Sequence, residues 1–190
     1  MPLFKAGPFR AVELAARDIP ALQRFFEENP EYFFAVGGEP PRPDEAREEF
    51  DFMPPPDYPF ERKWLVGFLD ASGAMIGMAG GLSNLFSEGV WHIGLFVVAT
   101  RLHGSGAALE MHRGLEGWMR DGGARWVRLG VVEGNARAER FWEKAGYLDA
   151  RKRHGVEMGK MVNTLRVMAK PLAGGGLEEY LSRVARDRPD

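Results

Sequence analysis

One apolar run, Val90 to Ala99, constrains the fold of this chain more than any other segment. It spans 10 residues and is interrupted by His92, so it is far below the ~20 residues that a membrane-spanning helix needs. Its nearly continuous apolar character is typical of a central strand that is buried on both faces of a sheet. The sequence therefore predicts a sheet in the middle of the protein.

Two helices are predicted to follow buried strands in the second half of the chain. The first lies after Arg101–Gly106 and ends at Gly122 and Gly123, and the second lies after the strand Trp126–Val132 and ends at Gly146. Asn135 is placed to cap the second helix. The apolar residues at helical spacing are Ala108, Met111, Leu115, Trp118 and Met119 in the first helix, and Ala138, Phe141, Trp142 and Ala145 in the second.

An antiparallel hairpin is predicted upstream, where Trp64–Asp70 and Ala74–Leu82 are separated by Ala71, Ser72 and Gly73. Two further strands are predicted at Arg10–Leu14 and Thr164–Ala169. Asp18 is placed to cap a helix that has Pro20 in its first turn. The apolar face of that helix is formed by Ile19, Leu22, Phe25 and Phe26.

A proline-bounded segment, Asp44 to Asp51, is predicted as a short acidic helix. It is compatible with a solvated surface loop and with a wall of a substrate cleft, and the sequence does not choose between them. Residues 1–172 are predicted to form one domain, and residues 173–190 a polar tail or a loosely attached helix.

Composition excludes several classes of protein. The chain has no Cys, so cysteine nucleophiles, thiol redox chemistry and cysteine zinc sites are excluded, and a cytoplasmic location is expected. No secretory leader or membrane segment is predicted. The histidines show no metal-ligand spacing, so no metal is expected. The short basic run 151–153 does not indicate nucleic-acid binding.

Charge is divided unevenly along the chain. Residues 1–90 carry 8 basic and 15 acidic side chains, a net charge of −7, whereas residues 91–190 carry 17 basic and 12 acidic ones, a net charge of +5. Chance could produce this division. It would also fit a protein with a cation-facing half and an anion-binding half.

The turn between the central strand and its helix has the features of an anion site. Gly104 and Gly106 allow a ligand to approach the backbone, and a helix start offers free amides and a positive dipole end. A P-loop is excluded, because that motif requires Gly-Lys followed by Ser or Thr and the turn contains no such sequence. A dinucleotide fingerprint nearly fits, but Leu109 stands where a third small residue is needed.

A third interpretation comes from two motifs together. Arg101, Gly104 and Gly106 match a loop motif that has Arg or Gln at its first position, Gly three residues later, and Gly or Ala two residues after that. The segment Asn135 to Tyr147 then has Asn, Ala three residues on, an aromatic pair, Lys, and Gly followed by an aromatic residue. In this strand and helix context the chain resembles the GNAT N-acetyltransferase superfamily. The motifs cover about residues 90–150, and the likeness of the first half is only architectural.

This resemblance implies the α/β (α+β) GNAT fold: a single-domain, mixed, mostly antiparallel sheet of about six to seven strands with splayed central strands, flanked by about four helices. It also implies acetyl-CoA as cosubstrate, with the pantetheine arm beside the central strand and the pyrophosphate on the glycine turn. The residues implied to bind the coenzyme are Phe96, Val97, Val98, Arg101, Leu102, His103, Gly104, Ser105, Gly106, Ala107, Asn135, Ala138, Phe141, Trp142 and Lys144.

The chain departs from the family at Trp142, where a tyrosine commonly protonates the departing thiolate. An indole N–H donates hydrogen bonds but is not a practical acid near neutral pH. Candidates for the base that takes a proton from the acceptor are His92, Glu133 and Glu88. Each also has a structural alternative: a core histidine, a loop-stabilising carboxylate and a surface residue, respectively.

The expected function is direct transfer of an acetyl group from acetyl-CoA to a primary amine of a small molecule or peptide, with the acceptor neutral or cationic. No nucleic-acid or membrane partner is expected, and a homodimer is allowed. The alternative is a noncatalytic acyl-CoA sensor, suggested by the missing tyrosine.

Overall fold

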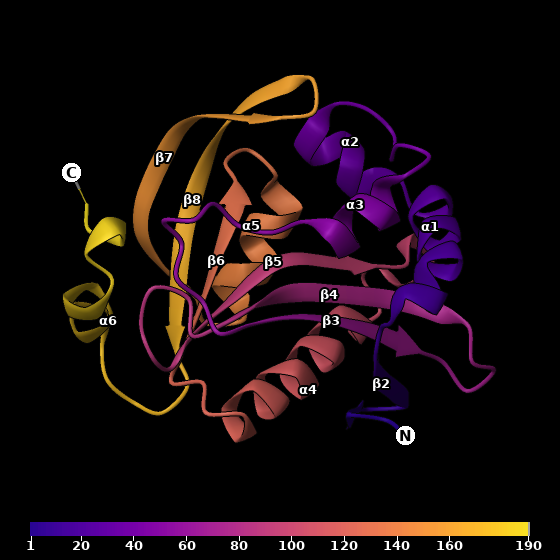
Figure 1. The fold of residues 1–190 in the computed structure, drawn as a ribbon, viewed down its shortest axis with the longest axis horizontal. Coiled ribbons are helices and arrows are strands. Elements are labelled where there is room, and N and C mark those ends of the chain that lie inside the picture. The colour runs from indigo at the N-terminus through magenta and orange to yellow at the C-terminus, as the bar shows by residue number, and fades with distance from the viewer. Residues whose placement is uncertain (190) are drawn as a thin grey trace.

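The computed structural model describes residues 1–189 and forms one open sheet with helices on both faces (Figure 1). The strand order is β1-β2-β3-β4-β5-β6-β8-β7. Every neighbouring pair is antiparallel except β5 and β6, which are parallel. The strands are β1 (Phe4–Ala6), β2 (Phe9–Glu13), β3 (Arg62–Leu69), β4 (Met75–Ser83), β5 (Val90–Val98), β6 (Trp126–Val132), β7 (Leu148–Met158) and β8 (Met161–Pro171).

Six α-helices accompany the sheet in the described part of the chain. They are α1 (Ile19–Glu28), α2 (Glu31–Gly37), α3 (Glu45–Asp51), α4 (Ala107–Asp121), α5 (Ala136–Lys144) and α6 (Leu177–Arg183). The mixed, mostly antiparallel fold class is therefore as predicted, but the described residues hold eight strands and six helices instead of six to seven and about four. The three-residue β1 and the seven-residue α2 are too short to show a clear periodicity.

The central strands separate part-way along their length. β5 and β6 pair only from Val90↔Trp126 to Ile93↔Leu129, although β5 continues to Val98. On its other side, β5 pairs with β4 through Ile93 and Leu95, which leaves Gly94 as an unpaired bulge. Figure 1 shows α1, α2 and α3 gathered on the side where β5 and β6 part. The fold therefore opens a wedge beside β5.

Helix α4 covers one face of the sheet with the apolar stripe that the sequence predicts. Met111, Leu115 and Met119 are fully buried. The ring of Trp118 lies 5.5 Å from that of Trp64 and 5.4 Å from that of Trp91, both edge-on. This packing fixes the C-terminal end of α4 against β3 and β5, because the helix cannot slide without breaking the aromatic contacts.

The helix start at Asp18 differs from the sequence expectation. Asp18 precedes α1, but its carboxylate accepts a hydrogen bond from the amide of Ala15 at 2.8 Å and does not cap the helix. The carboxylate closes the short 3₁₀ turn Ala16–Asp18 instead. The predicted apolar face of α1 is confirmed, because Ile19, Leu22, Phe25 and Phe26 are all buried.

The C-terminal segment is anchored more firmly than the expected loosely attached helix. Tyr180 of α6 is fully buried, and Val184 and Asp187 are each 1% exposed. Together with Val90 and Trp126 at the closed end of the central strands, Tyr180 and Val184 form a small second core. These few buried positions lie among charged residues, so the sequence shows no apolar pattern that would predict their burial.

Candidate active site

Three connected hollows lie in the wedge between the diverging strands. The main cavity, about 430 Å³, is lined by β5, β6, α3 and the segment 52–58. The turn recess, about 190 Å³, lies between α2, β5, the glycine turn and α5. The helix recess, about 260 Å³, lies between α2, α3 and β5. The main cavity and the turn recess meet at a junction, whose residues line both: Tyr32, Phe96, Asn135, Ala138 and Trp142.

The glycine turn presents free amides at the start of α4. Gly104 has a φ of +77° and Gly106, the N-cap residue, a φ of +89°. Among residues 1–189, the amides of Gly104, Gly106 and Ala108 have no protein acceptor. Such amides, at the positive end of a 15-residue helix, favour an anion.

Two arginines lie beside the turn, of which Arg101 was expected to bind the coenzyme and Arg137 was not singled out by the sequence. Arg101 is exposed, pairs with Asp70 at 3.6 Å and does not line the turn recess. Arg137 lines that recess and donates a hydrogen bond to His103 Nδ1 at 2.8 Å, while His103 Nε2 lies 3.0 Å from the carbonyl of Val98. The motif from Asn135 to Tyr147 specifies no residue at position 137, so the sequence did not single out Arg137.

Most of the residues expected to bind the coenzyme are brought together here. Leu102, Ser105, Gly106 and Ala107 form the remainder of the turn, and Lys144 is exposed at the end of α5, outside the recess. The expected residues that line the turn recess are Phe96, Val97, Val98, His103, Gly104, Asn135, Ala138, Phe141 and Trp142. Asn135 also caps α5, because its Oδ1 accepts a hydrogen bond from the amide of Ala138 at 3.4 Å.

Trp142 is packed within a group of rings. Its ring centroid lies 5.7 Å from that of Phe96, 5.3 Å from that of His112 and 5.2 Å from that of Tyr147. The Tyr147 hydroxyl is 3.0 Å from His112 Nε2, and burial raises the pKa of Tyr147 well above its usual range. Tyr147 is therefore held in the core and is a poor acid.

Tyr32 of α2 was not singled out by the sequence, yet it lines all three hollows. It is the one junction residue that carries a hydroxyl. Burial, and then the negative charges of Glu49 and Glu45, raise the pKa of Tyr32. Its hydroxyl therefore keeps its proton and is available as a hydrogen-bond donor.

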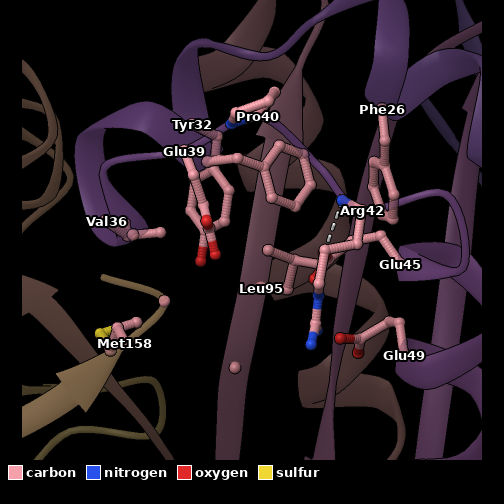
Figure 2. Close-up of a pocket in the computed structure, with 14 residues that line it drawn as sticks. Phe26, Tyr32, Val36, Glu39, Pro40, Arg42, Glu45, Glu49, Leu95 and Met158 are labelled. Atoms are coloured by element: carbon pink, nitrogen blue, oxygen red, sulfur yellow. Dashed lines mark hydrogen bonds and ion pairs between the residues drawn. The ribbon is translucent and has the colours of Figure 1, made fainter. Parts of the chain in front are cut away.

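Glu49 of α3 was also missed as an individual residue. It lines the main cavity and the helix recess, and Figure 2 shows it on the same side of that recess as Arg42 and Glu45, across from Tyr32. Burial raises its pKa to about 7, against the opposing charge of Lys63. Its Oε1 lies over β4, since a Cβ built on Gly80 would be 3.2 Å from it.

Lys63 of β3 fixes the C-terminal end of α3. Its ammonium donates hydrogen bonds to the carbonyl of Phe50 at 2.9 Å, the carbonyl of Phe52 at 2.8 Å, and also the carbonyl of Glu49. These carbonyls have no partner within the helix, and a cation there also interacts favourably with the helix dipole. Lys63 thereby holds the helix turn that carries Glu49.

The three predicted base candidates occupy different surroundings. His92 lines the main cavity, but burial, followed by the charge of Arg128, lowers its pKa to about 3. Glu133 is exposed and paired with Lys152, and it does not line the cavity. Glu88 is exposed in the turn before β5, at the end where β5 and β6 are still paired. Only His92 therefore faces the cavity.

His92 also touches a buried ion pair at the floor of the main cavity. Its Nδ1 lies 3.1 Å from the carbonyl oxygen of Arg128 and 3.4 Å from Arg128 Nη1. The same guanidinium binds Asp187, which also accepts a hydrogen bond from the Tyr180 hydroxyl at 2.5 Å. His92 is thus a neutral member of a structural network.

The family model described as the acetyltransferase (GNAT) family matches residues 22–147. The chain belongs to this family. It is accordingly an acyltransferase of the GNAT type, and the family uses acetyl-CoA. A search of curated proteins found no match.

Solved structures of GNAT enzymes share the fold. An acetyltransferase from Thermus thermophilus is 18% identical with a TM-score of 0.68, covering 90% of this chain and 100% of its own. Spermidine N-acetyltransferase from Vibrio cholerae, in complex with CoA and spermine, is 14% identical with a TM-score of 0.67, covering 87% and 96%. The ribosomal-protein-S18-alanine N-acetyltransferase from Escherichia coli is 16% identical with a TM-score of 0.63, covering 88% and 96%.

No group of three or more His, Asp or Glu side chains within residues 1–189 is arranged to hold a metal ion. No helix in the same range combines the length and the apolar character needed to cross a bilayer.

Proposed function

We propose that this GNAT protein transfers an acetyl group directly from acetyl-CoA to a primary amine. One observation carries the proposal: the turn recess and the main cavity meet at the junction, between strands that part beside it. A coenzyme in the recess and an amine in the cavity would bring their reacting atoms together there. Holding both reactants in this way supplies much of the acceleration in a direct transfer.

The coenzyme would lie along β5, with its pantetheine arm beside Phe96 to Val98. The free amides of Gly104, Gly106 and Ala108 would bind the pyrophosphate. Arg137, at the edge of the turn recess, would add a positive charge beside it. This arrangement would place the thioester at the junction.

Tyr32 supports the departure of the coenzyme sulfur in this proposal. The indole of Trp142 cannot supply a proton, whereas Tyr32 lines the same junction and its hydroxyl stays protonated. It would donate a hydrogen bond to the sulfur as negative charge develops on it. Such donors act most strongly where charge appears in the transition state.

Consumption of acetyl-CoA by the purified protein, with and without a panel of primary amines, tests the function. Release of coenzyme thiol that depends on an amine, with the acetyl group recovered on nitrogen, is the expected result. The loss of a hydroxyl acid at Trp142 favours one other function, a noncatalytic acyl-CoA sensor. Tight coenzyme binding without turnover for any amine would support the sensor and contradict the transferase.

A further inference from the structure

The main cavity is mostly apolar, with uncharged polar side chains at Tyr32, Tyr58, His92 and Asn135 and a few charged groups that differ in their partners. Lys63 donates hydrogen bonds to the carbonyls at the end of α3, and Arg128 forms an ion pair with Asp187. Arg153 of β7 also lines the cavity. Glu49 is the one carboxylate among the residues that line it. The apolar lining is formed by Phe52, Pro54, Pro55, Leu82, Leu85, Ile93, Leu95, Leu129, Val131, Met158, Leu165 and Val167, among others.

The carboxylate of Glu49 lacks a partner of its own. No hydrogen bond or ion pair between residues 1–189 uses its side-chain oxygens, in contrast to Glu45 and Glu48 of the same helix, which both pair with Arg42. Lys63 acts on Glu49 through its charge, but the Lys63 ammonium donates its hydrogen bonds to the carbonyls at the end of α3 and, within residues 1–189, forms no ion pair with the carboxylate. A buried carboxylate without a direct hydrogen-bond partner is costly, and a bound ammonium group would supply that partner.

The position of Glu49 also supports a role in binding the ammonium group. Glu49 Oε1 lies over Gly80, whose partner on β5 is Leu95, next to the Gly94 bulge that is open to the cavity. The charge of Glu49 also acts on Tyr32, which lies at the junction. Glu49 is therefore near the place where the two reactants would meet.

We propose that Glu49 binds the ammonium group of the acceptor and takes its proton, and that the acceptor is a primary amine on an apolar body. This inference rests on the proposed transferase function. The apolar walls would receive the body of the acceptor, which favours an apolar monoamine or a peptide with an apolar N-terminal residue over a polyamine. An acceptor with an acidic group close to the amine would be repelled by Glu49.

Each proton in the proposed transfer passes between the acceptor amine, Glu49, water and the coenzyme sulfur. The ammonium gives one proton to Glu49, which frees the nitrogen lone pair to form the N–C bond with the thioester carbonyl carbon. The C–S bond then breaks, and the second proton leaves the nitrogen through water to the coenzyme thiolate, which accepts a hydrogen bond from Tyr32. Glu49 returns its proton to solvent. A base with a pKa near the working pH is best matched to this task.

Glu49→Gln tests the role of this carboxylate, with Glu48→Gln as the matched control on the exposed face of the same helix. Glu49→Gln is expected to lower kcat/KM for an active amine by about 100-fold or more at pH 7. In the parent, kcat/KM should rise with pH through about 7, where Glu49 loses its proton. The variant should lose that limb of the profile, while Glu48→Gln keeps the parent profile.

Acetyl-CoA binding, measured by thermal shift, should be unchanged in both variants, which shows that they are folded. A Glu49→Gln variant that keeps the parent kcat/KM and the same limb near pH 7 would overturn the inference. A parent that binds acetyl-CoA but acetylates no amine would instead overturn the proposed transferase function. The two failures are therefore distinguishable.

Acceptor chemistry is tested with 2-phenylethylamine, spermine, aspartate and a short peptide with an N-terminal phenylalanine. The phenylalanine peptide or 2-phenylethylamine should have the highest kcat/KM. A higher value for spermine or aspartate would overturn the assigned acceptor class.

Discussion

Asp187 holds the guanidinium of Arg128 through two hydrogen bonds, of 2.6 and 3.0 Å, across 59 positions of sequence. Both side chains are almost entirely buried, at 6% exposed for Arg128 and 1% for Asp187. Because Arg128 also lines the main cavity and touches His92, the end of the chain takes part in forming the cavity floor. The last described segment is thus packed against the sheet beside the main cavity.

Asp187→Asn should destabilise the protein by about 3–5 kcal/mol, because it leaves the Arg128 charge buried without its partner. Urea denaturation measures this loss. Glu179→Gln, at an exposed carboxylate of α6, is the control and should change stability by less than about 1 kcal/mol. Equal, small effects of the two substitutions would show that the buried ion pair does not stabilise the fold.

Gly104→Asp should abolish acetyl-CoA binding, since the new side chain places bulk and negative charge where the phosphates would rest. Ligand-induced thermal stabilisation reports this directly. Gly123→Asp is a matched control: Gly123 has a φ of +97° and, like Gly104, nothing within 4 Å of an added Cβ. The control carries the same backbone strain at the other end of α4 and should still bind. Undiminished binding by Gly104→Asp would mean that the phosphates lie elsewhere.

Trp142→Phe and Tyr32→Phe should differ in their effect on turnover. Trp142 shapes the junction, so an aromatic replacement should keep most of kcat. Tyr32→Phe removes the proposed hydrogen bond to the sulfur and should lower kcat by about 100-fold with little change in coenzyme affinity. Steady-state kinetics together with coenzyme titration separate the two effects. A large loss in Trp142→Phe with Tyr32→Phe near the parent would reverse these roles.

The stability of the protein should fall as the solution is acidified from about pH 6.5, the ordinary pKa of histidine, toward 3. His112 is 1% exposed, and burial lowers its pKa to about 3, so the unfolded chain binds a proton there that the folded protein refuses. His112 contributes at most about 1.4 kcal/mol per pH unit to the slope, His92, whose pKa is also lowered to about 3, contributes in the same direction, and Glu49, whose pKa is raised to about 7, opposes them. His112→Gln should reduce the slope by the contribution of one proton, measured by urea denaturation at a series of pH values. An unchanged slope would mean that His112 is protonated in the folded state.

The parts of the fold with long, periodic patterns were predictable from sequence. The stripe of α4, the strand β6 and the Asn135 cap agree with the structure because local spacing determines them. Only part of the candidate site could be predicted from the sequence. The glycine turn is a local motif, whereas Tyr32 and Glu49 lie on seven-residue helices and acquire their properties through burial among distant strands. The buried partner of Arg128 likewise depends on a tertiary contact.

The hydrogen bonds from Lys63 to the end of α3 bear on how the preference for an acceptor could change. The proposed coenzyme side of the cleft is built on α2, β5, the glycine turn and α5, whereas Glu49 belongs to a short proline-bounded segment whose helix, α3, is held by Lys63 of β3 and by Gln23 of α1. Substitutions on the cavity face of this segment should leave the coenzyme side undisturbed. Acceptor preference could therefore change separately from coenzyme binding, as long as α3 still offers its terminal carbonyls to Lys63.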